Sequence, residues 1–134
     1  MDEITAADEK LIEAFHLMYD HFPEAAQLVH KSKRIVALNP ACKAIGREVG
    51  MICARHGPPE AHNGCLADKT VKSHSAAWKT GPKTTSDGRE PIIFWLPVDG
   101  YPDFYIHFAV GYKNYVTPPV EQQLGAPPLL PPHA

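Results

Sequence analysis

Hydrophobic residues recur at helical spacing in the first part of the chain. Between residues 5 and 22, large apolar side chains lie three or four positions apart, which is typical of one helix face. Thr5 is placed to cap this predicted helix, and Pro23 ends it. Such an apolar face must cover either its own sheet or a second copy of the chain. The second alternative makes the stripe a candidate dimer contact, with the residues Leu11, Phe15, Met18 and Phe22.

The next segment alternates short apolar runs with turn and cap residues. Residues 26–29 and 35–38 are apolar and flank a polar stretch, which predicts an antiparallel hairpin. Asn39 and Pro40 follow directly. Asn is a good helix cap and Pro suits the first helical position, so we predict a short helix over residues 41–45.

The second half of the chain predicts one further helix and three strands. Residues 66–79 have the spacing of a helix, which the sequence Thr80-Gly81-Pro82 ends. The predicted strands span residues 83–86, 91–98 and 104–112, with Asp-Gly turns between them.

The last predicted strand alternates between two distinct faces. One face carries Phe104, Ile106, Phe108 and Val110, and the other carries Tyr105, His107, Ala109 and Gly111. Because a sheet usually turns its continuous apolar face to the core, we expect the Phe104 face to line the interior. The other face would then lie under the N-terminal helix. In the reverse arrangement, Tyr105 and His107 would be placed to bind a polar ligand.

Composition limits the class of protein. The chain has 134 residues, which fits one domain, and 44% of them are hydrophobic, as in globular proteins. A formal net charge of −2 argues against nucleic-acid binding, and no apolar run reaches the roughly 18 residues of a membrane helix. The acidic N-terminus does not have the pattern of a secretory signal. Three cysteines, an odd number, predict reduced thiols in a cytoplasmic protein.

These patterns divide the chain into three parts. Residues 1–22 are the predicted dimerisation helix, and residues 23–116 form the domain. Residues 117–134 hold six of the 14 prolines, so we expect them to form an extended tail without a core.

The order of elements from Pro23 to Tyr112 resembles the PAS sensor-domain family. In that family the second strand is closed by Asn, and a short helix and a Gly-x-x-x-Gly step follow. The matching residues here are Ile35, Asn39, Pro40, Ala41, Gly46 and Gly50. The resemblance implies an α+β fold: a five-stranded antiparallel sheet with helices on one face, an internal pocket, and an N-terminal amphipathic helix.

For function, the resemblance implies a stand-alone sensory module rather than an enzyme. Such a module binds a small ligand or cofactor in its pocket and acts through a homodimer or a signalling partner. The candidate pocket residues are His74, Trp78, Phe94, Phe104, Tyr105, Ile106, His107 and Phe108.

The resemblance leaves the cofactor open. Haem-binding relatives carry an axial histidine on the helix before the third strand, and His74 lies on the corresponding predicted helix here. Flavin attachment would need a cysteine motif on the helix preceding the pocket, and the sequence does not show that motif.

The stretch CARHGPPEAHNGC, from Cys53 to Cys65, is the second candidate site. A bacterial subset of PAS domains has a similar loop, and His62 stands where that loop has a cysteine. Cysteine and histidine are both zinc ligands, so Cys53, His56, His62 and Cys65 form a candidate metal site. A reversible Cys53–Cys65 disulfide and a purely structural loop are the alternatives. A cysteine-dependent enzyme is a further alternative, although the sequence shows no third residue to orient a catalytic histidine.

Overall fold

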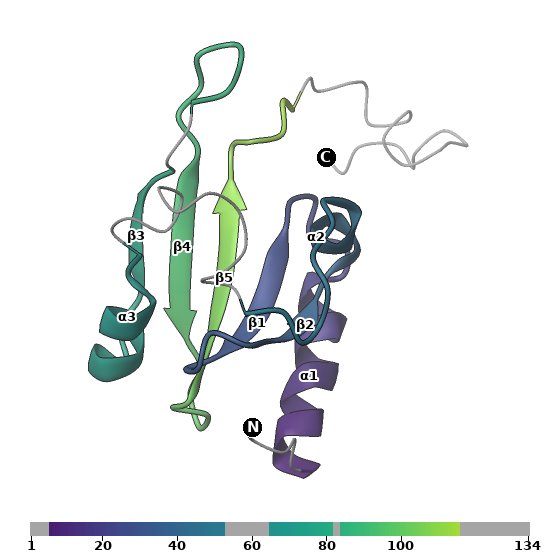
Figure 1. The fold of residues 1–134 in the computed structure, drawn as a ribbon, viewed down its shortest axis with the longest axis vertical. Coiled ribbons are helices and arrows are strands. Elements are labelled where there is room, and N and C mark those ends of the chain that lie inside the picture. The colour runs from purple at the N-terminus through teal and green to yellow at the C-terminus, as the bar shows by residue number, and fades with distance from the viewer. Residues whose placement is uncertain (1–5, 53–64, 82–83, 116–134) are drawn as a thin grey trace, which may run out of the picture.

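The structure is a computed structural model that describes residues 6–52, 65–81 and 84–115 (Figure 1). Its elements are α1 (Ala6–Tyr19), β1 (Ala26–His30), β2 (Ile35–Leu38), α2 (Pro40–Ala44), α3 (Ala67–Ser73), β3 (Ala77–Thr80), β4 (Ile92–Pro97) and β5 (Phe104–Val110). The predicted N-terminal helix, hairpin, short helix and last two strands are confirmed. None of the helices in the described ranges is both long and apolar enough to cross a bilayer.

All five strands belong to one antiparallel sheet in the order β2-β1-β5-β4-β3. The last strand of the chain, β5, pairs with both β1 and β4 and occupies the centre of the sheet. The α+β fold class that the sequence predicts is therefore confirmed. Because directly opposed residues of paired strands point to the same face, the register also divides the side chains between two faces.

One face of the sheet packs against α1. Leu11 and Phe15 of the helix are 7% and 1% exposed, and they share a core with Leu28 of β1 and Ile106 of β5. The helix thus covers its own sheet, the first of the two alternatives. The expectation that the Tyr105 face lies under this helix is wrong. Both faces of β5 contribute buried side chains, Ile106 on one and Tyr105 on the other, so alternation alone does not indicate which face meets which helix.

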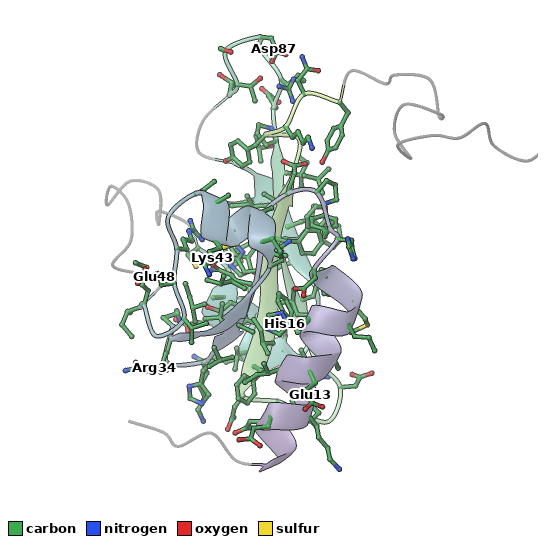
Figure 2. All side chains as sticks on the ribbon, turned by 90° about the vertical axis from the view of Figure 1, so that its right-hand side faces the viewer. Glu13, His16, Arg34, Lys43, Glu48 and Asp87 are labelled. Atoms are coloured by element: carbon green, nitrogen blue, oxygen red, sulfur yellow. The ribbon has the colours of Figure 1, made fainter. Side chains whose placement is uncertain are left out.

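The opposite face packs against α2 and α3. A second core joins Trp95 and Tyr105 of the sheet to Cys42 of α2 and Ala67 of α3. In Figure 1, α2 lies near one end of β1 and β2, and α3 lies beside β3 toward the other end of the sheet. Figure 2 views the sheet edge-on, with α1 on one side and the α2 segment on the other.

Residues 66–79 do not form the single helix that their spacing predicts. The helix α3 ends at Ser73, His74 adopts a left-handed φ of 50°, and β3 begins at Ala77. β3 pairs with β4, and its side chains alternate in exposure as in a strand. Pairing with a strand distant in sequence outweighs the local helix propensity of these residues. The strand predicted at residues 83–86 is also wrong, since the described residues 84–86 lie in the β3–β4 connection.

The buried side chain of Asn39 ties three elements together. Its Oδ1 accepts hydrogen bonds from the backbone N–H of Ala26, at 3.0 Å, and of Cys42, at 2.9 Å. Its Nδ2 donates to the backbone carbonyls of Tyr19, Phe22 and Glu24. The side chain is therefore not only the N-cap of α2, as predicted, but also the point where α1, β1 and α2 meet.

The buried carboxylate of Glu24 holds the segment that follows β5. It accepts hydrogen bonds from the backbone N–H groups of Gly111, Tyr112 and Lys113, at 2.7 to 3.0 Å, and from the Tyr115 hydroxyl, at 2.6 Å. Burial by itself raises the pKa of Glu24, but the four hydrogen bonds together lower it by more. The pKa of Glu24 therefore lies below its ordinary value of 4.5. Burial and the Glu24 carboxylate raise the pKa of Tyr115 to about 12.

The same segment is held from a second side by Arg89, in the β3–β4 connection. Its Nη1 donates to the backbone carbonyls of Gly111 and Lys113, while its Nε donates to Asp87. Gly111 has a φ of 111°, and a Cβ there would lie 3.1 Å from Pro91 Cα. Glycine is therefore needed at this position, where the chain turns out of the sheet.

We expect Asn39→Ala to destabilise the fold by about 4 kcal/mol, because it removes five hydrogen bonds and leaves buried backbone groups without partners. Urea unfolding, followed by circular dichroism, measures the change. Lys43→Ala, at an exposed position on α2, is the control and should cost less than about 0.5 kcal/mol. Equal losses in both variants would contradict the central role of Asn39.

We expect Glu24→Gln to reduce the loss in free energy of unfolding that occurs as the pH is lowered. Because the pKa of Glu24 is lowered in the folded state, its contribution is complete above the unfolded value of 4.5 and is lost as the pH falls through the folded value. Urea unfolding at several pH values between neutral and acidic should therefore show a smaller loss of stability in the variant. The control is Asp87→Asn. Arg89 and Thr85 lower the pKa of Asp87 to about 2, but this carboxylate is exposed and contributes little.

Candidate ligand site on the α2–α3 face

A polar rung crosses the middle of the sheet on the α2–α3 face. Gln27 of β1 lies opposite His107 of β5, which lies opposite Trp95 of β4, and Trp95 in turn lies opposite Ala77 of β3. Directly opposed side chains on one face are close enough to interact. The rung therefore places an amide, an imidazole and an indole side by side.

The His107 ring is fixed between two neighbours of β4. It stacks on the Trp95 ring with centroids 4.9 Å apart and an angle of 15° between the planes. Its Nδ1 lies 2.9 Å from the Phe94 carbonyl oxygen, which only accepts hydrogen bonds. Nδ1 therefore carries the proton that is shared with Phe94, and this hydrogen bond sets the tautomer of the neutral ring.

Gln27 is 1% exposed and receives two donors from the α2 side. Arg47, three residues beyond α2, donates from Nη1 to Gln27 Oε1 at 2.9 Å. Cys42 of α2 lies with its Sγ 3.6 Å from the same oxygen. The glutamine thus connects the centre of the sheet to α2 and to the segment that follows it.

The α3 end of the same face is more apolar. Trp95 and Tyr105 are 2% and 1% exposed and pack with Ala67 of α3. The Thr70 hydroxyl lies 3.5 Å from the Trp95 carbonyl oxygen, to which it donates. His107 lies on β5, which α3 contacts together with β4 and which pairs with β1, the strand that α2 contacts. The layer thus combines aromatic rings with an amide and a cation, which are the kinds of group that line small-molecule sites.

Several solved structures resemble this chain, among them the following three. A domain of an HTR-like protein from Haloarcula marismortui gives a TM-score of 0.51 at 20% identity and covers 65% of this chain and 95% of that one. The Rhodobacter sphaeroides LOV protein gives 0.55 at 19% identity, covering 76% and 66%. A sensory box sensor histidine kinase from Vibrio cholerae gives 0.53 at 12% identity, covering 81% and 97%. No family model matches the chain, and no curated protein matches it significantly.

These likenesses agree with the observed strand order and with helices α2 and α3 on one face of the sheet. The chain has a PAS fold. At 12 to 20% identity, the three structures establish the fold alone. The chemistry of the site in this PAS fold must therefore be argued from its own residues.

Most of the predicted pocket residues lie on the α1 face of the PAS sheet. Phe104, Ile106 and Phe108 belong to or pack against the core that contains Leu11 and Phe15. Phe94 stacks on Phe108, with ring centroids 4.9 Å apart. Of the candidates on β5, only Tyr105 and His107 face α2 and α3, which is the reverse arrangement considered from the sequence.

Two further candidates come from the segment that was predicted to be helical. Trp78 lies on β3, opposite Phe94, and is 61% exposed. His74 is the exposed residue that ends α3, and its Nε2 lies 2.8 Å from Asp99 Oδ1. A haem ligand at His74 would have to replace this interaction and would not lie inside a helix.

The candidate metal loop lies mostly outside the described residues. Cys53, His56 and His62 fall in the range 53–64, and only Cys65 is described, as an exposed free thiol. Within the described ranges, no three His, Cys, Asp or Glu side chains are grouped closely enough to hold a metal. The zinc and disulfide interpretations of this loop stay predictions.

The sequence did not single out Gln27, Cys42 or Arg47. A glutamine at the centre of the apolar run AAQLVH was the available signal, since a polar residue in a strand buried on both faces needs a partner. Its partners follow 15 and 20 positions later, and no pattern in the sequence indicates that pairing.

Proposed function

We propose that this PAS-fold chain is a sensory module that binds a small polar ligand on the α2–α3 face. The observation that supports this proposal is the polar rung of Gln27 and His107, with Arg47 beside it, in a layer that is otherwise apolar. A layer that only had to pack would be filled by apolar side chains, because burying polar groups costs free energy. Two similar solved structures, a LOV protein and a sensory box sensor histidine kinase, support a sensory role.

The contacts around α2 suggest how binding would be transmitted. A ligand on this face would touch the sheet through His107 and the α2 segment through Arg47. The start of α2 is bonded to Asn39, which also holds the Glu24 carbonyl, and the Glu24 carboxylate holds residues 111–115. A ligand that prefers one packing of α2 would therefore shift the population of positions that residues 111–115 adopt.

The proposal predicts that a bound compound depends on His107. Denaturing the freshly purified protein and analysing the released molecules by mass spectrometry identifies the compound, and an absorption spectrum shows whether it is coloured. We expect His107→Gln to weaken binding of that compound about tenfold, through loss of the stacked ring beside the ligand.

The matched control is His30→Gln, because His30 contacts Phe104, on the α1 face of the same sheet. This variant should bind the compound as the wild type does. Equal weakening in both variants, or a wild-type protein that retains no compound and is stabilised by none in a metabolite screen, would overturn the proposal.

We further propose that the module is a homodimer, with a contact that shares only Met18 with the predicted stripe, because Phe22 also packs against the core. Leu11 and Phe15 are occupied by the chain's own core, so a partner would have to meet the other side of α1. That side presents Leu17 and Met18, which are 88% and 65% exposed. Exposed apolar groups next to one another are typical of protein contacts.

The dimer proposal predicts that Leu17→Gln with Met18→Gln yields a folded monomer in light scattering, because it removes the apolar contact and leaves the core intact. Ile45→Gln, at a position 60% exposed on the α2 side, is the control and should stay dimeric. Deleting residues 1–22 should give a monomer or aggregate, since it also removes Leu11 and Phe15 from the core. A dimeric double variant would refute this contact.

A further inference from the structure

Arg47 is a cation whose hydrogen-bonding capacity is only partly used. Its Nη1 donates to Gln27, but its Nε is buried and has no hydrogen-bond partner. Within the described residues, no other buried side-chain nitrogen or oxygen lacks a partner. Buried polar groups are nearly always hydrogen-bonded, and a guanidinium is always charged, so this arrangement costs stability.

The acidic side chains near Arg47 do not neutralise it. Glu24 is the carboxylate at the adjoining end of β5, and its two oxygens are already occupied by four donors from residues 111–115. Glu48, the next residue in the chain, is exposed, and Arg47 makes no ion pair with it or with any other residue that the structure describes. Among the described residues, the positive charge is thus held beside the sheet without a counter-charge.

The surroundings fix the orientation of the guanidinium. Gln27 is fully buried on β1 and accepts a hydrogen bond from Nη1, so the half-buried Arg47 side chain is anchored to β1. The positive charge of Arg47 also affects Tyr112, just beyond the end of β5. Burial and then Glu24 raise the pKa of Tyr112, while Arg47 opposes them. An anchored guanidinium with unused N–H groups matches the paired oxygens of a carboxylate or a phosphate.

We propose that Arg47, positioned by Gln27, binds the oxyanion of the ligand on the α2–α3 face, and that this oxyanion is a carboxylate. This inference deepens the proposed function and rests on it. A carboxylate on a flat organic ligand is favoured over a phosphate because the neighbouring His107 and Trp95 side chains are aromatic. The carboxylate would accept from Nε and from the remaining guanidinium nitrogen, which satisfies the buried donor.

Calorimetric titration with benzoate, benzamide and inorganic phosphate tests the inference. Benzamide has nearly the same shape as benzoate but no charge, so it should bind at least about tenfold more weakly. Phosphate tests the other source of an oxyanion and should also bind more weakly than benzoate. Binding of benzamide as tight as benzoate, or tighter binding of phosphate, overturns the assignment to a carboxylate.

The matched pair of variants is Arg47→Lys and Arg34→Lys. Arg47→Lys keeps the charge but loses the planar fork, so we expect benzoate binding to weaken about tenfold. Arg34 donates from its Nη1 to the Gly50 carbonyl, and Arg34→Lys should leave benzoate binding unchanged. Equal effects of the two substitutions would show that benzoate binds elsewhere and would refute the assignment.

A second readout separates recognition from a merely structural role. If Arg47 serves the ligand, the ligand-free variants Arg47→Met and Gln27→Leu/Arg47→Met should melt at or above the wild-type temperature, because they remove a buried N–H group that has no partner. Both should lose benzoate binding. A lower melting temperature in the double variant, which leaves neither polar group behind, would indicate that Arg47 is structural.

The two levels of the proposal fail in different ways. If the protein retains an uncharged compound that depends on His107, the sensory proposal stands and the carboxylate inference is wrong. If neither benzoate nor phosphate at about 10 mM produces heat or raises the melting temperature, and no compound is retained, both proposals are wrong.

Discussion

The fold depends on one buried amide. Asn39 accepts two hydrogen bonds through Oδ1 and shares its two Nδ2 hydrogens among three carbonyls, and these contacts reach the backbone of three segments. Without it, the end of α1, the entry to β1 and the start of α2 would bury unpaired backbone groups at one place. A backbone group left in this way costs more than the hydrogen bond itself contributes, so the position tolerates no apolar substitute. The two helices could not then be held on opposite faces of one hairpin.

How far the sequence predicts this structure depends on how local each signal is. Asn39 and Pro40 indicate the start of α2 in the sequence, because capping depends only on residues a few positions apart. β3 was missed because it is defined by its pairing with β4, and its short sequence has no strong strand preference of its own. The two faces of β5 were assigned in reverse because helices cover both of them, so the more apolar face does not identify the helix that meets it.

The candidate site was predicted only in part, for the same physical reason. Tyr105 and His107 were named because they alternate with apolar neighbours in one strand. Arg47 and Gln27 meet across 20 positions of sequence, and only the packing of the segment after α2 against β1 brings them together. The site residues that the sequence suggested, Tyr105 and His107, lie on a strand. Arg47, which supplies the positive charge of the site, lies in the loop after α2.

The hydrogen bonds of Glu24 have a mechanical consequence. Its backbone carbonyl accepts a hydrogen bond from Asn39, and its carboxylate accepts hydrogen bonds from the chain that leaves β5. One residue therefore connects two parts of the fold that are far apart in sequence. The start of α2 and the departure of the chain from the sheet thus share a common anchor. The start of α2 and the segment after β5 cannot move relative to each other unless at least one of these hydrogen bonds breaks. A small displacement of α2 is therefore transmitted to the segment after β5.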